Sequence, residues 1–210
     1  MKKTIIFDFD GVIIDSSSIK ADAFNKLFSR YGKSIGIKAR NYHIENEGIP
    51  RIEKFNYINK YLLNSIKKHS LDELNKKYSK IVLDKILKKN LSYGFKKFLN
   101  KFNQEINFYI SSSAPGNELN YIIKNKKINN FFKVISGYPP KKNIQIKKIL
   151  INDKLNTKNV YYVGDTEHDY KISKKLNLNF IGYIRYGNKF KHRNINMVNS
   201  FNEIAKYIKK

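Results

Sequence analysis

The chain has 210 residues, of which 41% are hydrophobic and 14% are aromatic. This composition fits one folded domain, or one domain with a small insert, and excludes a disordered tail. The absence of cysteine excludes disulfides, cysteine-ligated metals and thiol nucleophiles, whereas a formal net charge of +25 raises the question of nucleic-acid binding.

The kind and distribution of the basic residues argue against a nucleic-acid surface. Only five of the 42 are arginine, the side chain best suited to bidentate contacts with phosphates and bases. The lysines are spread along the whole chain, and lysine, asparagine and isoleucine, which share AT-rich codons, are all abundant. We therefore expect a solvated lysine-rich surface, with nucleic-acid binding as the less favoured alternative.

The first residues do not have the pattern of a secretory signal. Asp8 and Asp10 interrupt the apolar start after a few residues, which is too short for the apolar region of a signal peptide. No stretch approaches the roughly 18 apolar residues of a membrane-spanning helix. We expect a cytoplasmic protein without a membrane anchor.

The first half of the chain predicts one strand followed by helices. Residues 4–9 form a short apolar run typical of a buried strand. Residues 16–90 have helical periodicity, interrupted at Gly48–Pro50, after which a second helix carries apolar residues as far as Ile66. A third helix is expected to begin near Ser70, because Ser-Leu-Asp-Glu has the pattern of a capping box.

The second half predicts alternating helices and strands, which is typical of a mostly parallel sheet with helices on both faces. We therefore predict an α/β fold with a Rossmann-like core, formed by residues 1–15 and 91–210. Residues 16–90 are expected to form a helical insert after the first strand. The expected helices cover 95–102, 116–125, 143–151, 167–176 and 201–208, and the expected strands cover 106–110, 131–135, 159–163 and 179–183.

Acidic side chains follow two of the expected strands, although the chain has few acids. Asp8 and Asp10 follow the first strand, and Asp165 and Asp169 follow the strand that ends near residue 163. The carboxyl ends of parallel strands meet at one edge of a sheet, where ligands bind. Converging carboxylates without cysteine favour Mg²⁺ held together with a substrate phosphate. The four histidines lack metal-ligand spacing and are expected to be surface or packing residues.

Four segments in this order resemble the motifs of the haloacid dehalogenase superfamily. Phe7–Ser16 (FDFDGVIIDS) resembles its opening motif, Ser111 its second-strand Ser/Thr, Lys142 its lysine, and Gly164–Asp169 (GDTEHD) its last motif. The resemblance covers residues 4–183, and the helical insert matches the cap of subfamily I. It implies a Mg²⁺-dependent enzyme similar to phosphoglycolate phosphatase or β-phosphoglucomutase.

The resemblance also implies roles for individual residues. Asp8 is expected to be the nucleophile that forms an aspartyl-phosphate, and Asp10 the general acid and then the general base. Lys142 is expected to neutralise the phosphoryl group and Asp8, although its neighbour Lys141 leaves the register open. True dehalogenases of the superfamily lack the second acid, so Asp10 favours a phosphatase or a phosphomutase.

The remaining expected site residues bind phosphate or metal. Ser111 and Ser112, with the Gly11 turn, are expected to bind the phosphoryl group, and Ser111 has a second interpretation as a helix N-cap. The expected metal ligands are Asp8, Asp10, Asp165 and Asp169, of which Asp169 has a second interpretation as a first-turn acid on a helix dipole.

Arg51 follows Gly48–Pro50 and resembles a cap arginine that reaches the substrate in sugar-phosphate members of the superfamily. It is a candidate ligand for a distal phosphate or carboxylate, or else a plain surface arginine. The expected function is a phosphoric monoester hydrolase that acts on a small phosphorylated metabolite. A sugar phosphomutase, a nucleic-acid-binding protein and an inactive regulatory relative are the alternatives, and a monomer and a homodimer both remain open.

Overall fold

A computed structural model describes residues 2–63, 70–185, 190–191 and 194–208. The chain divides into two compact units. Met1–Asp15 and Asn90–Lys210 form the first, here called the α/β unit, and Ser16–Lys89 form the second, here called the helical unit.

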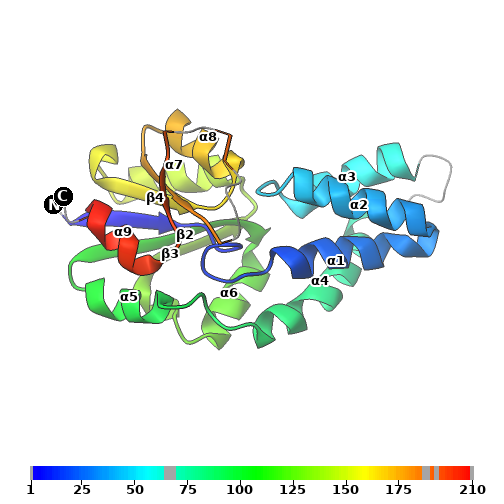
Figure 1. Cartoon of the computed structure of the whole chain (residues 1–210), viewed down its shortest axis with the longest axis horizontal. Helices are drawn as coiled ribbons and strands as arrows, with labels where there is room; N and C mark the ends of the chain where they lie inside the picture. Colours follow the sequence, from blue (N-terminus) through cyan, green and yellow to red (C-terminus); the bar gives the residue numbers. More distant parts are fainter. Residues whose placement is uncertain (1, 64–69, 186–189, 192–193, 209–210) are drawn as a thin grey trace. The chain divides into compact units, whose positions relative to one another are not determined.

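The α/β unit contains one six-stranded sheet in which all paired strands are parallel, so the predicted α/β class with a central parallel sheet is confirmed. The strand order is β3-β2-β1-β4-β5-β6, which places β1 and β4 side by side at the centre (Figure 1). The strands are β1 (Lys3–Phe7), β2 (Ile106–Pro115), β3 (Phe132–Tyr138), β4 (Val160–Gly164), β5 (Asn179–Tyr183) and β6 (Asn196–Val198).

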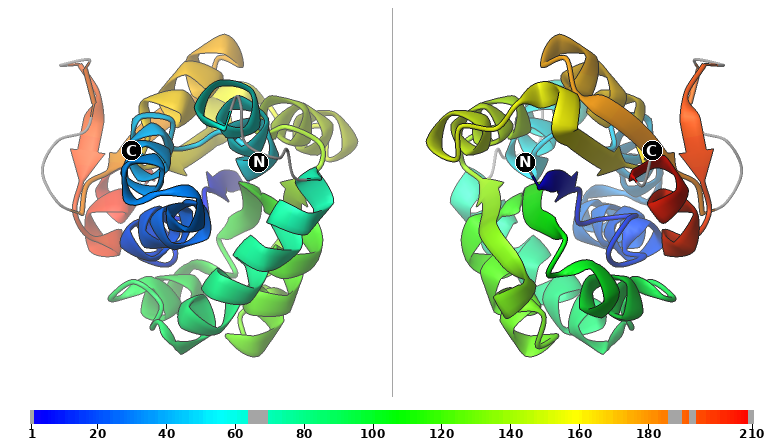
Figure 2. Two further views of the ribbon diagram at one scale, coloured as in Figure 1. Left: turned by 90° about the vertical axis from the view of Figure 1, so that its right-hand side faces the viewer. Right: turned by 90° about the vertical axis from the view of Figure 1, so that its left-hand side faces the viewer.

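Helices cover both faces of this sheet. In Figures 1 and 2, α7 and α8 lie on one face, and α5, α6 and α9 lie on the other. The helices are α5 (Phe95–Phe102), α6 (Gly116–Asn125), α7 (Lys142–Asn152), α8 (Glu167–Lys175) and α9 (Phe201–Ile208), with short 3₁₀ turns at Asn129–Phe131 and Thr157–Asn159. Sequence periodicity missed β6, because a strand of three residues is too short to show alternation.

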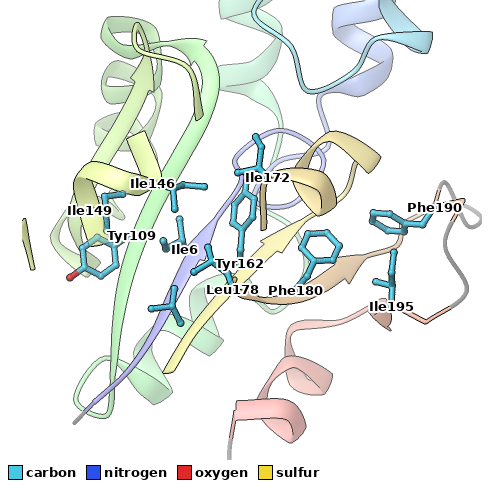
Figure 3. Close-up of a cluster of buried hydrophobic side chains, with 11 residues drawn as sticks. Ile6, Tyr109, Ile146, Ile149, Tyr162, Ile172, Leu178, Phe180, Phe190 and Ile195 are labelled. Atoms are coloured by element: carbon cyan, nitrogen blue, oxygen red, sulfur yellow. The ribbon is translucent and has the colours of Figure 1, made fainter. Parts of the chain in front are cut away.

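Neighbouring residues of β1 show how the two faces are filled, because side chains alternate across a strand. Ile6 belongs to a cluster of eleven buried residues that also includes Ile146 of α7 and Ile172 of α8 (Figure 3). Phe7 points to the other face, where its ring contacts those of Phe95 of α5 and Phe201 of α9. A strand buried on both faces explains why the sequence shows a continuous apolar run here.

The described residues of the helical unit form one helix more than the sequence pattern indicates. Its helices are α1 (Ser17–Phe28), α2 (Lys33–Glu45), α3 (Arg51–Tyr57) and α4 (Leu71–Lys88), with a 3₁₀ turn at Ser29–Tyr31 and a π-helical turn at Ile58–Leu62. The missed break is at Gly32, whose φ of 127° few other residues adopt.

The core of this unit is aromatic. Phe24 packs against Phe55 and Tyr78, whose ring centroids lie 5.5 and 5.0 Å away. The predicted cap of α4 is present, because the side chain of Ser70 accepts a hydrogen bond from the backbone N–H of Glu73. Ile66, expected on the second helix, lies outside the described residues, as do His69 and His192. No helix among the described residues is long and apolar enough to cross a membrane.

Candidate active site

Three buried carboxylates meet at the carboxyl ends of the central strands. Asp8 follows β1, Asp165 follows β4, and Asp169 lies in the first turn of α8. One oxygen of each lies within 4.8 Å of the others. The backbone places Asp8 there directly, because its N–H donates to the carbonyl of Val163 on β4 at 2.8 Å. Segments more than 150 residues apart therefore form one acidic cluster.

Lys142, the first residue of α7, joins two of these acids. Its Nζ lies 2.8 Å from Asp8 Oδ2 and 2.7 Å from Asp169 Oδ1. The three residues are at most 3% exposed, so these ion pairs are shielded from solvent and are weakly screened by salt. Lys141 is exposed, and the structure therefore places Lys142 rather than Lys141 in this cluster.

Asp169 also organises the start of α8. Its Oδ2 accepts a hydrogen bond from Thr166 Oγ1 at 2.6 Å, and the two residues form a reciprocal capping box. Its Oδ1 accepts a hydrogen bond from the hydroxyl of Tyr162 on β4, also at 2.6 Å. The interpretation of Asp169 as a first-turn acid therefore fits the structure, and the same carboxylate also contacts Lys142.

Two glycines let the backbone approach these carboxylates closely. Gly11 has a φ of 79°, and a Cβ there would lie 1.9 Å from Asp165 Oδ2. A Cβ at Gly164 would lie 2.5 Å from the Cβ of Asp169. Both distances are shorter than real carbon contacts. The glycines of the first and last motifs thus make room for the acids of the last motif.

The surroundings of Asp8 and Asp169, the two acids that contact Lys142, shift their pKa values in opposite directions. Burial, opposed by Lys142 and reinforced by Asp169 and Asp10, raises the pKa of Asp8 to about 7. Burial also acts on Asp169, but the charge of Lys142 and hydrogen bonds from Lys142, Thr166 and Tyr162 hold its pKa below the usual value. Asp169 accepts more hydrogen bonds that favour its ionised form, whereas the charges of Asp169 and Asp10 act against ionisation of Asp8.

The same contacts keep the amine of Lys142 protonated. Burial favours the neutral amine, but Asp169 and Asp8 outweigh this effect and raise the pKa of Lys142 above its usual value. Lys142 forms ion pairs with Asp8 and Asp169, and the cluster holds a third carboxylate, that of Asp165. When all three acids are ionised, the cluster therefore carries more negative charge than Lys142 balances. The buried donors are oxygen atoms alone, which is the ligand set that hard divalent cations prefer. These residues therefore fit a Mg²⁺ ion.

Asp10 was expected among the metal ligands, but its side chain is not part of this group of described residues. Asp10 lies two residues after Asp8, is partly buried, and pairs through its backbone with Ile14. Its charge raises the pKa of Asp8, which shows that the two carboxylates are close enough to interact. This position suits a group that exchanges a proton beside Asp8.

The loop after β1 is braced by a residue that sequence reasoning did not select. Arg185, which follows β5, donates from Nη2 to the carbonyls of Gly11 and Val12 at 3.2 and 3.3 Å. The same nitrogen donates to Ser92 Oγ at 2.6 Å. The guanidinium therefore holds the turn that carries Gly11 against Asp165, and its position in the sequence gave no signal of this contact.

The serines expected to bind phosphate lie at the same end of the sheet. Ser111 comes directly after Ile110, which is paired with Phe7, so Ser111 lies level with Asp8 on the neighbouring strand. Its hydroxyl donates to Gln145 Oε1 at 2.8 Å, and Ser112 Oγ accepts from the N–H of Ala114 at 3.1 Å. The N-cap interpretation of Ser111 is wrong, because β2 continues to Pro115, which occupies the cap position of α6.

Arg51 lies in the helical unit, where its side chain is bound to α4. Its Nε donates to Asn75 Oδ1 at 2.6 Å, and its Nη2 donates to Ser79 Oγ at 2.8 Å. The guanidinium also lies over the ring of Tyr78, 5.1 Å from the centroid. These contacts give Arg51 a structural role that the sequence did not indicate.

Tyr162 and Gln145 also contact the expected site residues and were missed. Tyr162 was not selected because it lies in an apolar strand and reads as a core residue. Its ring does belong to the buried cluster beneath α7 and α8 (Figure 3). Gln145 did leave a signal, because it is a polar residue on the same side of α7 as the buried Ile146 and Ile149. A polar side chain among core positions needs a hydrogen-bond partner.

One protein family matches most of this chain. Residues 5–183 match the sequence model of a family described as haloacid dehalogenase-like hydrolases. No curated protein matches.

Solved structures provide further matches to this chain. A β-phosphoglucomutase from Clostridium difficile has 20% identity, a TM-score of 0.77, and coverage of 100% of this chain and 96% of that one. A protein from Lactobacillus plantarum assigned to the phosphoglycolate phosphatases has 15% identity, a TM-score of 0.77, and coverage of 98% and 99%. A Bacillus subtilis hydrolase described as bound to magnesium has 15% identity, a TM-score of 0.74, and coverage of 100% and 99%. At these identities the likeness shows the fold.

Proposed function

This chain belongs to the haloacid dehalogenase-like hydrolase family, and we propose that it is a Mg²⁺-dependent phosphatase that hydrolyses a small phosphorylated metabolite. The observation that carries the proposal is the buried cluster of Asp8, Asp165, Asp169 and Lys142 at the ends of the central strands. A carboxylate beside a fixed ammonium group suits nucleophilic attack on an anionic phosphorus centre.

Asp8 is proposed as the nucleophile. An oxygen of Asp8 bonds to phosphorus, the bond from phosphorus to the ester oxygen breaks, and Asp10 gives its proton to that oxygen as the alcohol leaves. Asp10 then takes a proton from water, whose oxygen attacks the phosphorus of the aspartyl-phosphate. The bond between Asp8 and phosphorus breaks, which releases phosphate and regenerates the carboxylate of Asp8 and the protonated form of Asp10. Lys142 stabilises the charge that develops on the phosphoryl oxygens.

Asp8, Asp165 and Asp169 are proposed to hold Mg²⁺, directly or through water. An ion held there would supply charge neutralisation between the nucleophile and the substrate oxygens. Asp165 lies close to Gly11, and Asp169 is held by Thr166, Tyr162 and Lys142. The described contacts therefore fix Asp169 beside the nucleophile before a ligand binds, as catalytic groups require.

The helical unit is proposed to be the cap of this enzyme, with residues 16–90 as the insert and residues 1–15 and 91–210 as the core. In this proposal the cap selects the substrate and excludes water during the first transfer. The role of Arg51 as a ligand for a distal phosphate or carboxylate stays a prediction. Its bonds to Asn75 and Ser79 would have to be exchanged for bonds to substrate.

A sugar phosphomutase is the second candidate. It is favoured by the structural likeness to β-phosphoglucomutase and by Asp10, because the same aspartyl-phosphate could pass to a sugar hydroxyl instead of water. Conversion of β-glucose 1-phosphate to the 6-phosphate without release of inorganic phosphate would support the mutase.

The proposal is tested by assaying phosphate release from an aryl phosphate, sugar phosphates, nucleotides and phosphoglycolate. We expect turnover that requires Mg²⁺ and is lost on chelation. Asp8→Asn and Asp10→Asn should each abolish it, whereas Asp84→Asn, which alters an exposed acid of α4 paired with Lys88, should leave it unchanged. Full activity in excess chelator, or in Asp8→Asn, would contradict the proposal.

The same variants address nucleic-acid binding. Phosphate contacts of a nucleic-acid surface need only cations, so DNA binding should survive Asp8→Asn and weaken with salt. Salt-sensitive binding together with absence of turnover on every phosphate ester would favour that alternative.

A further inference from the structure

Three consecutive carbonyls of the loop after β1 are bound by residues from distant parts of the chain. Arg185 Nη2 donates to the carbonyls of Gly11 and Val12 at 3.2 and 3.3 Å. Ser92 Oγ lies 2.5 Å from the carbonyl of Val12 and 3.0 Å from that of Ile13, which also accepts from the Ser92 N–H at 2.8 Å. The loop is buried, so the loss of these donors would destabilise its conformation.

The direction of each proton in this arrangement is determined. A guanidinium group only donates hydrogen bonds, so Ser92 Oγ accepts from Arg185 Nη2 at 2.6 Å. The hydroxyl proton of Ser92 is then available to the carbonyls of Val12 and Ile13, which only accept. Arg185 therefore supports the loop twice, by its own bonds and through Ser92.

Arg185 is itself held at the end of β5. Its guanidinium carbon lies 5.5 Å from the centroid of the Tyr183 ring, and that ring stacks on Phe201 of α9 with a centroid distance of 5.0 Å. The N–H of the preceding residue, Ile184, donates to the carbonyl of Val198 on β6 at 2.7 Å. The arginine thus links the loop after β1 to β5, β6 and α9.

Both peptide groups that flank Asp10 are bound within this loop. The carbonyl of Phe9, in the peptide before Asp10, accepts from the N–H groups of Ile13 and Ile14 at 2.9 and 3.1 Å. The N–H of Gly11, in the peptide after Asp10, donates to the carbonyl of Ile14 at 2.8 Å. A movement of residues 11–14 would therefore carry the backbone of Asp10 with it.

Asp8, two residues before Asp10, is held by other groups. Its N–H donates to the carbonyl of Val163 on β4, and its carboxylate contacts Lys142. Among the described contacts of Arg185, none involves these groups. Loss of Arg185 should therefore displace Asp10 and leave Asp8 in place.

We propose that Arg185 is a positioning residue for Asp10, which it places beside the leaving oxygen of the substrate by holding the carbonyls of Gly11 and Val12. The inference rests on the proposed function, in which Asp10 gives its proton to that oxygen. Arg185 acts through the loop and does not touch the reacting atoms. Its effect should grow with the basicity of the leaving group, because a weakly basic phenolate departs without a proton.

The test is Arg185→Met, assayed with phenyl phosphate and 2,4-dinitrophenyl phosphate in the presence of Mg²⁺. The phenolate released from phenyl phosphate is basic and needs the proton of Asp10, so kcat/KM should fall by about 30-fold. The dinitrophenolate needs no proton, so its kcat/KM should fall by about threefold or less. The Kd for inorganic phosphate, measured by calorimetry, should remain within about twofold because Asp8 and Lys142 keep their contacts.

Ser92→Ala is a second variant, which removes the hydroxyl but keeps the bonds from Arg185 to the loop. It should show the same dependence on the leaving group with a smaller loss, and it carries the test if Arg185→Met does not fold. Arg30→Met is the matched control, because Arg30 is an exposed arginine that lies over the ring of Tyr31, 4.7 Å from the centroid. It should leave the ratio of the two kcat/KM values unchanged.

The possible outcomes separate this inference from the proposed function. A wild-type protein that hydrolyses neither ester overturns the proposed function, and the inference with it. If the wild type hydrolyses both esters, equal losses on the two in Arg185→Met overturn the inference alone, since they indicate general damage to the α/β unit. Activity like that of the wild type on both esters in this variant has the same consequence.

Discussion

The two units of this protein bury charged side chains in different ways. In the α/β unit, buried Lys142 contacts the carboxylates of Asp8 and Asp169. In the helical unit, buried Lys54 donates to His43 Nδ1 at 2.9 Å, and its ammonium lies 5.8 Å from the centroid of the Phe24 ring. His43 in turn stacks on Phe24 with a centroid distance of 4.6 Å.

This difference separates a reactive arrangement from a packing arrangement. In the proposed mechanism, the acids beside Lys142 supply a nucleophile and a site for a cation, and hydrogen bonds from Tyr162 and Thr166 fix the carboxylate of Asp169. The described contacts of Lys54 are to an imidazole nitrogen, a carbonyl and an aromatic face, which solvate the ammonium without providing a nucleophile. Burial of a lysine alone therefore does not indicate a catalytic site.

The largest expected effect comes from removing the lysine of the α/β unit. Lys142→Met leaves Asp8 and Asp169 buried without their ammonium partner, so activity should fall by about 10³-fold and the free energy of unfolding by about 3 kcal/mol. Lys141→Met, one residue earlier and exposed, is the control and should retain activity. Steady-state kinetics and urea denaturation measure the two quantities, and equal activities in both variants would remove Lys142 from the mechanism.

The next effect concerns the turn beside Asp165. Gly11 and Gly94 both have a φ of 79°, but a Cβ at Gly94 would meet nothing within 4 Å. Alanine at either position should cost about 1–2 kcal/mol of stability from backbone strain. Only Gly11→Ala should displace Asp165 and lower kcat/KM, by about 100-fold. Similar activities of the two variants would show that the contact with Asp165 is unimportant.

A pH dependence should distinguish the helical unit. Burial, together with the positive charges of Lys54, Lys20 and Arg40, lowers the pKa of His43 to about 2. The unfolded chain takes up this proton below about pH 6.5, whereas the folded unit does not, so stability falls as the pH falls. Between about pH 7.5 and pH 5, His43 should remove about 2 kcal/mol from the free energy of unfolding.

The measurement compares urea denaturation of wild type and His43→Gln at both pH values. The variant lacks the titrating ring, so its stability should fall by about 2 kcal/mol less over this range. Parallel losses in the two proteins would mean that His43 is protonated in the folded unit.

The smallest expected effect tests the hydrogen bonds around Asp169. Tyr162→Phe removes a donor to a buried carboxylate that retains Lys142 and Thr166, so kcat/KM should fall by roughly fivefold and stability by about 1 kcal/mol. Tyr161→Phe is the control, since its hydroxyl donates to the carbonyl of Tyr207 at 3.1 Å, away from Asp169. An unchanged kcat/KM in Tyr162→Phe would make this bond purely structural.

The order of elements in the α/β unit was accessible from the sequence because apolar runs and amphipathic helices alternate there. The boundaries of α5, α6, α9 and β5 agree with the expectation, whereas β2 runs five residues beyond its expected end at Ile110. The sequence of that extension, Ser111–Pro115, is polar and lacks a β-forming pattern. Its pairing with β3 at Ser111 and Pro115 is a tertiary effect.

The acids of the candidate site were accessible for a topological reason, since parallel strands bring their carboxyl ends to one edge. The residues that contact these acids and their loops were harder to predict from the sequence. Tyr162 has the same apolar signature as its neighbours in β4, and the link between Arg185 and Gly11 spans 174 residues without a local pattern. Such contacts depend on which strands are neighbours, and spacing along the chain does not encode that.

The central position of β1 has a consequence for synthesis on the ribosome. The proposed nucleophile, Asp8, emerges early, whereas β4 and Asp169, which complete its surroundings, emerge about 150 residues later. Until β4 docks, neither the carbonyl of Val163 nor the ammonium of Lys142, oriented by Asp169, can hold Asp8 in place. A nascent chain therefore carries the carboxylate of Asp8 without its buried partners, and the proposed active site is assembled only when β4 is inserted between β1 and β5.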